Sequence, residues 1–152
     1  MSLPQYPAEL PWPELDGYRM QPVSPFVRTE LASGRARQRR RFTNTPTMVP
    51  VSWLFSLGEF ELFEAWFRHQ ITDGADWFTG PLKTSRGIRD DYEQRFADMY
   101  EAREVGPMYW RVSARLELRD RQTASAAEGE FPLELIYSSL FDRTMNRHWP
   151  DA

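Results

Sequence analysis

Hydrophobic positions between residues 49 and 82 change their period twice, which predicts a strand, a helix and a second strand. Residues 49–55 alternate between apolar and other side chains, as in a half-buried strand. Ser56 then stands three residues before Glu59, the spacing of a capping box that opens a helix. Large apolar side chains recur from there at spacings of three and four, so we expect a helix over residues 56–69. These side chains are Leu57, Phe60, Phe63, Trp66 and Phe67.

The helical stretch ends at Asp73-Gly74, and an apolar run over residues 77–82 predicts the strand that follows. Aromatic side chains gathered in this way could form a ligand cage. Core packing is their commoner role, because they dominate core burial. We therefore expect this part of the chain to be scaffold.

The clearest strand pattern covers residues 108–119, where the even-numbered side chains are apolar and the odd-numbered ones are mostly charged or polar. Residues 92–100 alternate in part, and Val105-Gly106-Pro107 is typical of a turn. These two stretches predict a long antiparallel hairpin with one buried face and one polar face. Such a hairpin would supply the sheet that the helix covers.

Four arginines alternate along residues 34–42 and would share one face of a strand. They are Arg35, Arg37, Arg39 and Arg41. Residues 43–47 have the composition of a turn, so the arginine strand is expected to pair with residues 48–55 as a hairpin. Pro50 has no amide hydrogen for a sheet ladder, which implies an edge, a bulge or a strand start.

Two functions fit the arginine strand. Guanidinium groups pair with phosphates, which favours nucleic-acid binding. Alternatively, the strand is solvated or faces a protein surface whose carboxylates meet the arginines. The net charge of −3 and the lack of interleaved aromatic side chains favour the second interpretation, with an acidic patch on the partner.

Residues 1–27 hold six of the twelve prolines, so this segment is expected to be extended. It also carries several large apolar side chains, in which a disordered tail would be poor. These are Leu10, Trp12, Leu15, Tyr18 and Phe26. We expect an arm that lies on a surface, its own or that of a neighbour; the alternative is a flexible terminus.

Residues 123–130 are small and polar, which is typical of a linker. Pro132 suits the first turn of a helix, and the apolar residues beyond it recur at spacings of three and four. They are Leu133, Ile136, Tyr137, Leu140 and Phe141. This amphipathic helix is expected to dock on its own domain or on a partner.

A chain of 152 residues predicts one domain: an arm (residues 1–27), a β core (28–121), and a linker with a terminal helix (122–152). The absence of cysteine excludes disulfides, thiolate metal sites and thiol nucleophiles, and two histidines are too few for a histidine cage. The chain lacks an apolar run long enough for a membrane span and a signal-peptide pattern at its start, so we expect a soluble protein made inside the cell.

Carboxylates are the strongest candidates for catalysis, as the neighbours Asp90 and Asp91 or as the helix residues Glu59, Glu61 and Glu64. Acid–base pairs must converge in a cleft, whereas neighbours in a strand point apart and the helix glutamates lie on its polar side. Motifs for phosphate, dinucleotide, zinc or nucleophilic-serine chemistry are absent. We expect no enzyme activity and no catalytic, cofactor or metal site.

The order of these parts resembles the minor tail proteins of long-tailed bacteriophages, in particular the distal-tail and tail-tip group. The resemblance covers residues 28–121 and rests on VRTELASGRARQRRRFTNTPTMVPVSWLFS, the helix GEFELFEAWFRHQ, the motif DGADWFTGPL and the strand MYWRVSARLELRDR. The ending FDRTMNRHWP is also similar to that of phage proteins encoded among tail genes. The long proline-rich arm and the C-terminal helix depart from the smallest proteins of this group.

This resemblance implies an α+β, mainly β fold: a small antiparallel β-barrel or sandwich with one flanking helix. It further implies a structural virion protein of the tail (tip, tube, neck or adaptor), made in the host cytoplasm. Copies would form a ring, typically hexameric, around a channel that passes DNA, in contact with other tail proteins and no membrane. The expected interface residues are Arg35, Arg37, Arg39, Arg41, Trp12, Tyr18, Leu133, Ile136, Tyr137, Leu140, Phe141 and Trp149. The alternatives are a nucleic-acid-binding module that uses the arginine strand and a hydrolase with a carboxylate pair.

Overall fold

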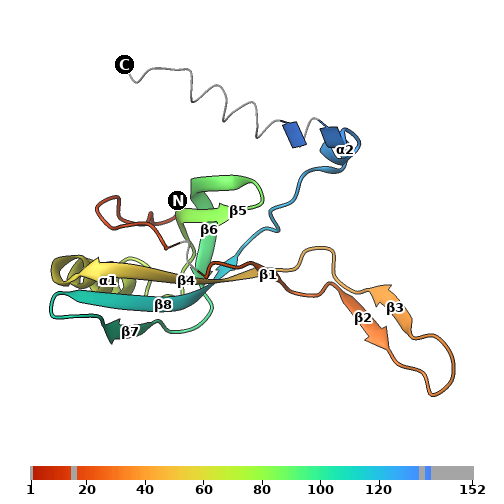
Figure 1. The fold of residues 1–152 in the computed structure, drawn as a ribbon, viewed down its shortest axis with the longest axis horizontal. Helices are drawn as coiled ribbons and strands as arrows, with labels where there is room; N and C mark the ends of the chain where they lie inside the picture. Colours follow the sequence, from red (N-terminus) through yellow and green to blue (C-terminus); the bar gives the residue numbers. More distant parts are fainter. Residues whose placement is uncertain (1, 15–16, 134–135, 138–152) are drawn as a thin grey trace. The chain divides into compact units, whose positions relative to one another are not determined.

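The computed structural model describes residues 2–14, 17–133 and 136–137 and divides the chain into two compact units, Met1–Arg121 and Gln122–Ala152 (Figure 1). The first unit contains β1 (Gln21–Pro22), β2 (Phe26–Thr29), β3 (Arg37–Arg40), β4 (Thr47–Ser56), α1 (Leu57–His69), β5 (Phe78–Thr84), β6 (Gly87–Phe96), β7 (Glu101–Glu104) and β8 (Tyr109–Leu118). The second contains the short helix α2 (Ala126–Gly129).

The main sheet has the strand order β1-β4-β8-β6-β5, and β7 pairs with β8 beside β6. All strand pairs in it are antiparallel, and every residue of β4 has a partner in β8. The predicted α+β, mainly β class is therefore confirmed. Across the described residues the sheet stays open, so it is not the closed barrel that was one of the two expected forms.

Alternation along β4 places every second side chain in the core, as predicted, and α1 packs on the same face. The ring of Phe63 lies 5.6 Å from that of Trp53 and 5.2 Å from that of Phe55. The helix begins as predicted, with the Ser56 amide donating to the Glu59 carboxylate at 2.7 Å. The aromatic stripe is thus core, although Leu57 at the start of the helix is exposed.

The N-terminal segment lies on its own unit and adds to the core, which confirms the expectation of a surface-bound arm. Tyr6 and Leu10 are buried. The Tyr6 amide donates to the Thr79 carbonyl at 2.8 Å, and the indole of Trp66 donates to the Gln5 carbonyl at 3.0 Å. The arm therefore extends the β5 edge by a short parallel bridge.

Pro50 stands at an interrupted sheet edge, in keeping with its missing amide hydrogen. Strand β1 pairs with β4 only at Thr47 and Met48. The next backbone hydrogen bond from the arm runs from the Glu14 amide to the Ser52 carbonyl, at 2.8 Å. Pro50 lies between these two contacts, where no donor is needed.

The arginine strand β3 pairs with β2 and not with β4, so the hairpin predicted for residues 34–55 is wrong. The turn that reverses the chain lies before β3, where Gly34 takes a φ of +99° that glycine tolerates without strain. Residues 41–46 do not turn back; they run beside residues 23–25, with hydrogen bonds from Val23 to Pro46 and from Arg41 to Pro25. The β2–β3 hairpin therefore extends from the end of the β1–β4 pair.

The structure also differs from the single long hairpin predicted for residues 92–119, because β8 forms its hairpin with β7. The turn at residues 105–108 joins β8 to β7, a strand that the pattern missed because its residues are mostly charged and it is an edge strand. Strand β6 begins at Gly87, ends at Phe96 and pairs with β8 only at residues 94–96. The predicted buried side of β8 is confirmed at Val112, Leu116 and Leu118, but it is wrong at Met108, which lies before the strand and is exposed.

Candidate assembly surfaces

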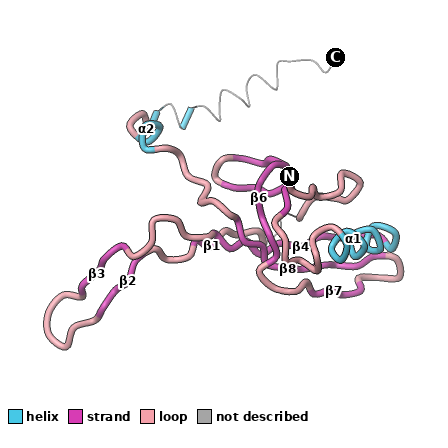
Figure 2. Tube along the Cα trace, turned by 180° about the vertical axis from the view of Figure 1, so that it is seen from behind, coloured by secondary structure: helices cyan, strands magenta, loops and turns pink. Residues whose placement is uncertain are grey.

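The β2–β3 hairpin is exposed at every residue of both strands. Figures 1 and 2 show it at the end of β4 where that strand begins, away from α1. Residues 24–43 hold six arginines and one glutamate, a net charge of +5, so the rest of the chain carries −8. The hairpin is therefore a basic segment, whereas the rest of the chain is acidic.

The pairing of β2 with β3 determines which arginines share a face. Val27 is opposite Arg39 and Thr29 is opposite Arg37, so these two arginines lie together, as the alternation predicted. Arg35 and Arg41 lie just outside β3 and are exposed. The Arg41 guanidinium stands 5.4 Å from the centre of the Phe42 ring.

Several of these cations have no partner in the part of the chain that the structure describes. Arg40 donates to the carbonyls of Phe42 and Thr43, and Arg28 pairs with a neighbouring glutamate at 2.9 Å. The guanidinium groups of Arg35, Arg37 and Arg39 make no hydrogen bond or ion pair with any described residue. A partner that supplies acceptors can reach all three.

Apolar side chains accompany the arginines on the hairpin. Four large ones are exposed, and Phe42 keeps 53% of its surface. They are Phe26, Val27, Leu31 and Phe42. Exposed apolar groups near arginines are typical of protein interfaces, because arginine and aromatic residues are enriched there.

The two aromatic arm residues expected at an interface differ in their surroundings. Trp12 keeps 52% of its surface exposed. Tyr18 is half-buried and donates its hydroxyl to the Lys83 carbonyl. Burial raises the pKa of Tyr18 to about 12. Tyr18 thus ties the arm to β5, whereas Trp12 is the one of the two that a neighbour could bury.

In the C-terminal unit, Leu133, Ile136 and Tyr137 are exposed. Leu140, Phe141 and Trp149 lie outside the described residues. The expected linker contains a helical turn, α2, which the Ser125–Glu128 capping box explains: each side chain accepts from the other's backbone amide.

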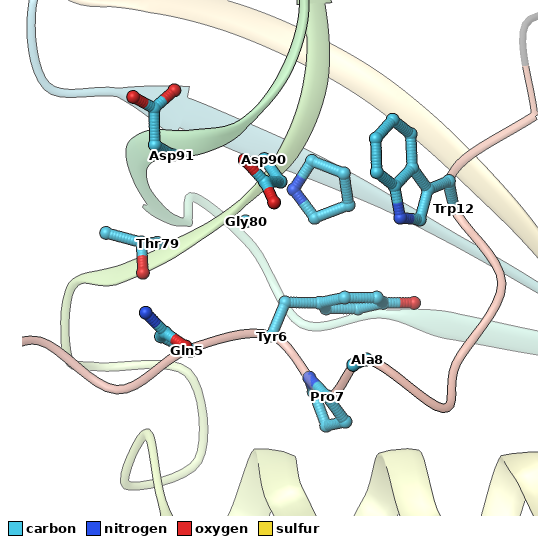
Figure 3. A pocket seen from close by; sticks show the side chains of 10 residues that line it. Gln5, Tyr6, Pro7, Ala8, Trp12, Thr79, Gly80, Asp90 and Asp91 are labelled. Atoms are coloured by element: carbon cyan, nitrogen blue, oxygen red, sulfur yellow. The ribbon is translucent and has the colours of Figure 1, made fainter. Parts of the chain in front are cut away.

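A cavity of about 390 Å³ opens where the arm crosses β5 and β6 (Figure 3). Trp12 lines one side, and Asp90 and Asp91 line the other. The two carboxyl groups point in different directions, as expected for neighbours in a strand, and Asp91 pairs with Arg89. This cavity therefore does not bring the two carboxylates together as an acid–base pair.

The helix glutamates also serve separate contacts. Glu59 caps α1, and Glu64 accepts a hydrogen bond from the Tyr100 hydroxyl at 3.0 Å. Within the described residues, no group of three or more His, Cys, Asp or Glu side chains is placed to hold a metal ion. The same residues include no helix long and apolar enough to cross a membrane.

Comparison with known proteins gives one significant similarity of fold. The chain matches no protein-family model and no curated protein. A chain in the solved structure titled "Virion of native gene transfer agent (GTA) particle" is similar to it with a TM-score of 0.51. The two share 15% sequence identity, and the similarity covers 78% of this chain and 97% of the other. At this identity the comparison establishes a shared fold.

Proposed function

We propose that the protein is a structural component of a phage-like virion and acts in the tail, as a tip, tube or adaptor protein. The observation that carries this proposal is the fold, which it shares with nearly the whole of a chain in the gene transfer agent virion. The resemblance of residues 28–121 to minor tail proteins agrees with it. The chain would be made in the host cytoplasm and taken into the particle.

In this role several copies form a ring, which we expect to be hexameric, around a channel that DNA crosses in transit. Other tail proteins are the further partners, and neither a membrane nor an enzymatic or cofactor reaction is involved. The exposed hairpin supports assembly, because exposed apolar side chains together with several arginines are typical of a protein-binding surface.

Deletion of the gene from cells that produce the particles tests this function. We expect the deletion to yield DNA-filled heads without functional tails, and complementation by the full chain to restore them. Mass spectrometry of purified normal particles should detect the protein in several copies per particle. Intact, functional particles without the protein would overturn the proposal.

Nucleic-acid binding is the second candidate, because the guanidinium groups of Arg35, Arg37 and Arg39 have no acceptors among the described residues. Binding of duplex DNA by these residues predicts an affinity that falls log-linearly with salt, with a slope of about −0.9 for each phosphate contacted. A structural role predicts weak DNA binding that the replacement of all three arginines by alanine changes little. Fluorescence anisotropy over a salt series separates the two functions.

A further inference from the structure

We infer that copies of this chain join head to tail: the β2–β3 hairpin of one copy docks on the end of the main sheet where β7 turns into β8 in the next copy. This inference rests on the proposed function, because it names the two surfaces through which the ring would form. It follows from exposure, from charge and from the positions of the two surfaces in the fold.

The receiving surface, here called the β7–β8 end, is apolar and exposed. It comprises Leu57, Val105, Met108 and Tyr109, of which Met108 keeps 59% of its surface. The pairing brings these residues together: Tyr109 is the partner of Ser56, which precedes Leu57, and the Val105 amide donates to the Tyr109 carbonyl at 2.9 Å. The patch therefore spans the start of α1 and the β7–β8 turn.

The two segments that carry this patch contain more acidic than basic residues. Residues 97–109 contain three acidic residues and one arginine, and α1 contains three glutamates and one arginine, so each segment has a net charge of −2, although Asp98 is paired with Arg115 of β8. Glu101 and Glu104 on β7 are exposed. The β7–β8 end thus combines apolar groups with the charge opposite to that of the hairpin.

One copy cannot satisfy both surfaces by itself. The hairpin joins β4 at its first residues, and the β7–β8 end lies beside the last residue of the same strand. The ten residues of β4 separate them by about 30 Å at the rise of an extended strand. Figures 1 and 2 both show the hairpin and the α1–β7 side at opposite ends of β4.

Opposite charge at opposite ends selects one type of contact. Two hairpins would repel each other at +5 each, and two acidic ends would repel as well. A contact between the hairpin of one copy and the β7–β8 end of the next copy buries apolar groups on both sides. It also pairs Arg37 and Arg39 with carboxylates. Such a contact is heterologous, and repeated contacts of this kind close into a ring when the rotation allows.

Because the chain contains no cysteine, single cysteines can map this contact in the full-length protein. We would mix Leu31→Cys and Met108→Cys proteins, both changed at exposed positions, and add a short bismaleimide. The mixture should give covalent dimers at least tenfold more abundantly than either variant alone. The control Ile88→Cys, also exposed, should give only background with Leu31→Cys. Equal yields in all mixtures would overturn the inference.

Charge reversal provides an independent test by sedimentation. Arg37→Glu with Arg39→Glu should weaken self-association at least tenfold, and mixing with Glu101→Arg plus Glu104→Arg protein should restore mixed assemblies. Arg19→Glu, an exposed arginine outside the hairpin, is the matched control and should not change assembly. Circular dichroism should show that all variants remain folded.

The outcomes distinguish this contact from the proposed function. A wild-type protein that assembles without any effect of charge reversal overturns the head-to-tail contact and leaves the virion role standing. A wild-type protein that stays monomeric overturns the contact as well. Absence of the protein from purified particles overturns the virion role itself.

Discussion

Gly74, in the turn that follows α1, couples backbone geometry to aromatic packing. Its φ of +84° is one that side-chain-bearing residues rarely adopt. A Cβ at this position would lie 2.8 Å from the Phe67 ring and 3.3 Å from the Cβ of Phe96. Both rings are part of the core, 4.9 Å apart and edge to face. The Asp73-Gly74 pair marked the helix end in the sequence, but the packing role of the glycine depends on long-range contacts that no local pattern contains.

Gly74→Ala should destabilise the protein by roughly 2–4 kcal/mol, because backbone strain and overlap with Phe67 act together. The control is Gly87→Ala, which also has a positive φ of +106° but open space around it, and which should cost about 1 kcal/mol. Urea unfolding followed by circular dichroism measures both. Equal losses of stability would contradict the packing argument.

Tyr100 makes the stability of the fold depend on alkaline pH. Burial, strengthened by the hydrogen bond to Glu64, raises the pKa of Tyr100 to about 12. Because this lies above the value of about 10 in the unfolded chain, the folded state keeps the proton longer. The stabilisation is complete below about pH 10 and is lost as the pH rises towards about 12.

The free energy of unfolding should therefore fall over this alkaline range, and Tyr100→Phe should make the fall shallower. The remaining slope should come in part from Tyr18, whose pKa is also raised by burial. Urea titrations at a series of pH values supply the measurement. Parallel slopes for the two proteins would refute the assignment to Tyr100.

Among the elements, the arm and the hairpin show why some parts of the fold could be predicted and others could not. Strand β4 and helix α1 followed from periodicity, since β4 buries every second side chain and α1 buries Phe63, Trp66 and Phe67. The arm was expected on a surface from its composition, but two of its side chains, Tyr6 and Leu10, follow no periodic pattern that would place them in the core. The partner of β3 was missed because Gly34, and not residues 43–47, turns the chain.

Substitutions in the arm measure its contribution to the core. Tyr6→Ala should cost about 3–5 kcal/mol of stability, as for an aromatic residue in a core, because its ring packs against Trp53 and Trp66. Trp12→Ala, in the same arm but exposed, should cost less than about 1 kcal/mol. Thermal or urea unfolding compares them. Similar small effects would mean that the arm does not contribute to the core.

In the whole molecule, the basic hairpin and the acidic β7–β8 end lie at opposite ends of β4. The sequence favoured a solvated or protein-facing arginine strand over nucleic-acid binding, and the alternation placed Arg37 and Arg39 on one face. It did not indicate that the hairpin stands at one end of β4, or that an apolar acidic surface lies at the other, because both facts depend on strand pairing across the chain. The candidate assembly surfaces are thus products of topology as well as composition.

The mass of the purified full-length protein, measured by native mass spectrometry over a range of concentrations, tests the assembly claim most directly. A heterologous contact that closes predicts one discrete oligomer, expected to be a hexamer, whose mass stays constant once it has formed. The charge-reversed hairpin variant should then remain monomeric. A wild-type chain that is monomeric at every concentration would contradict the account.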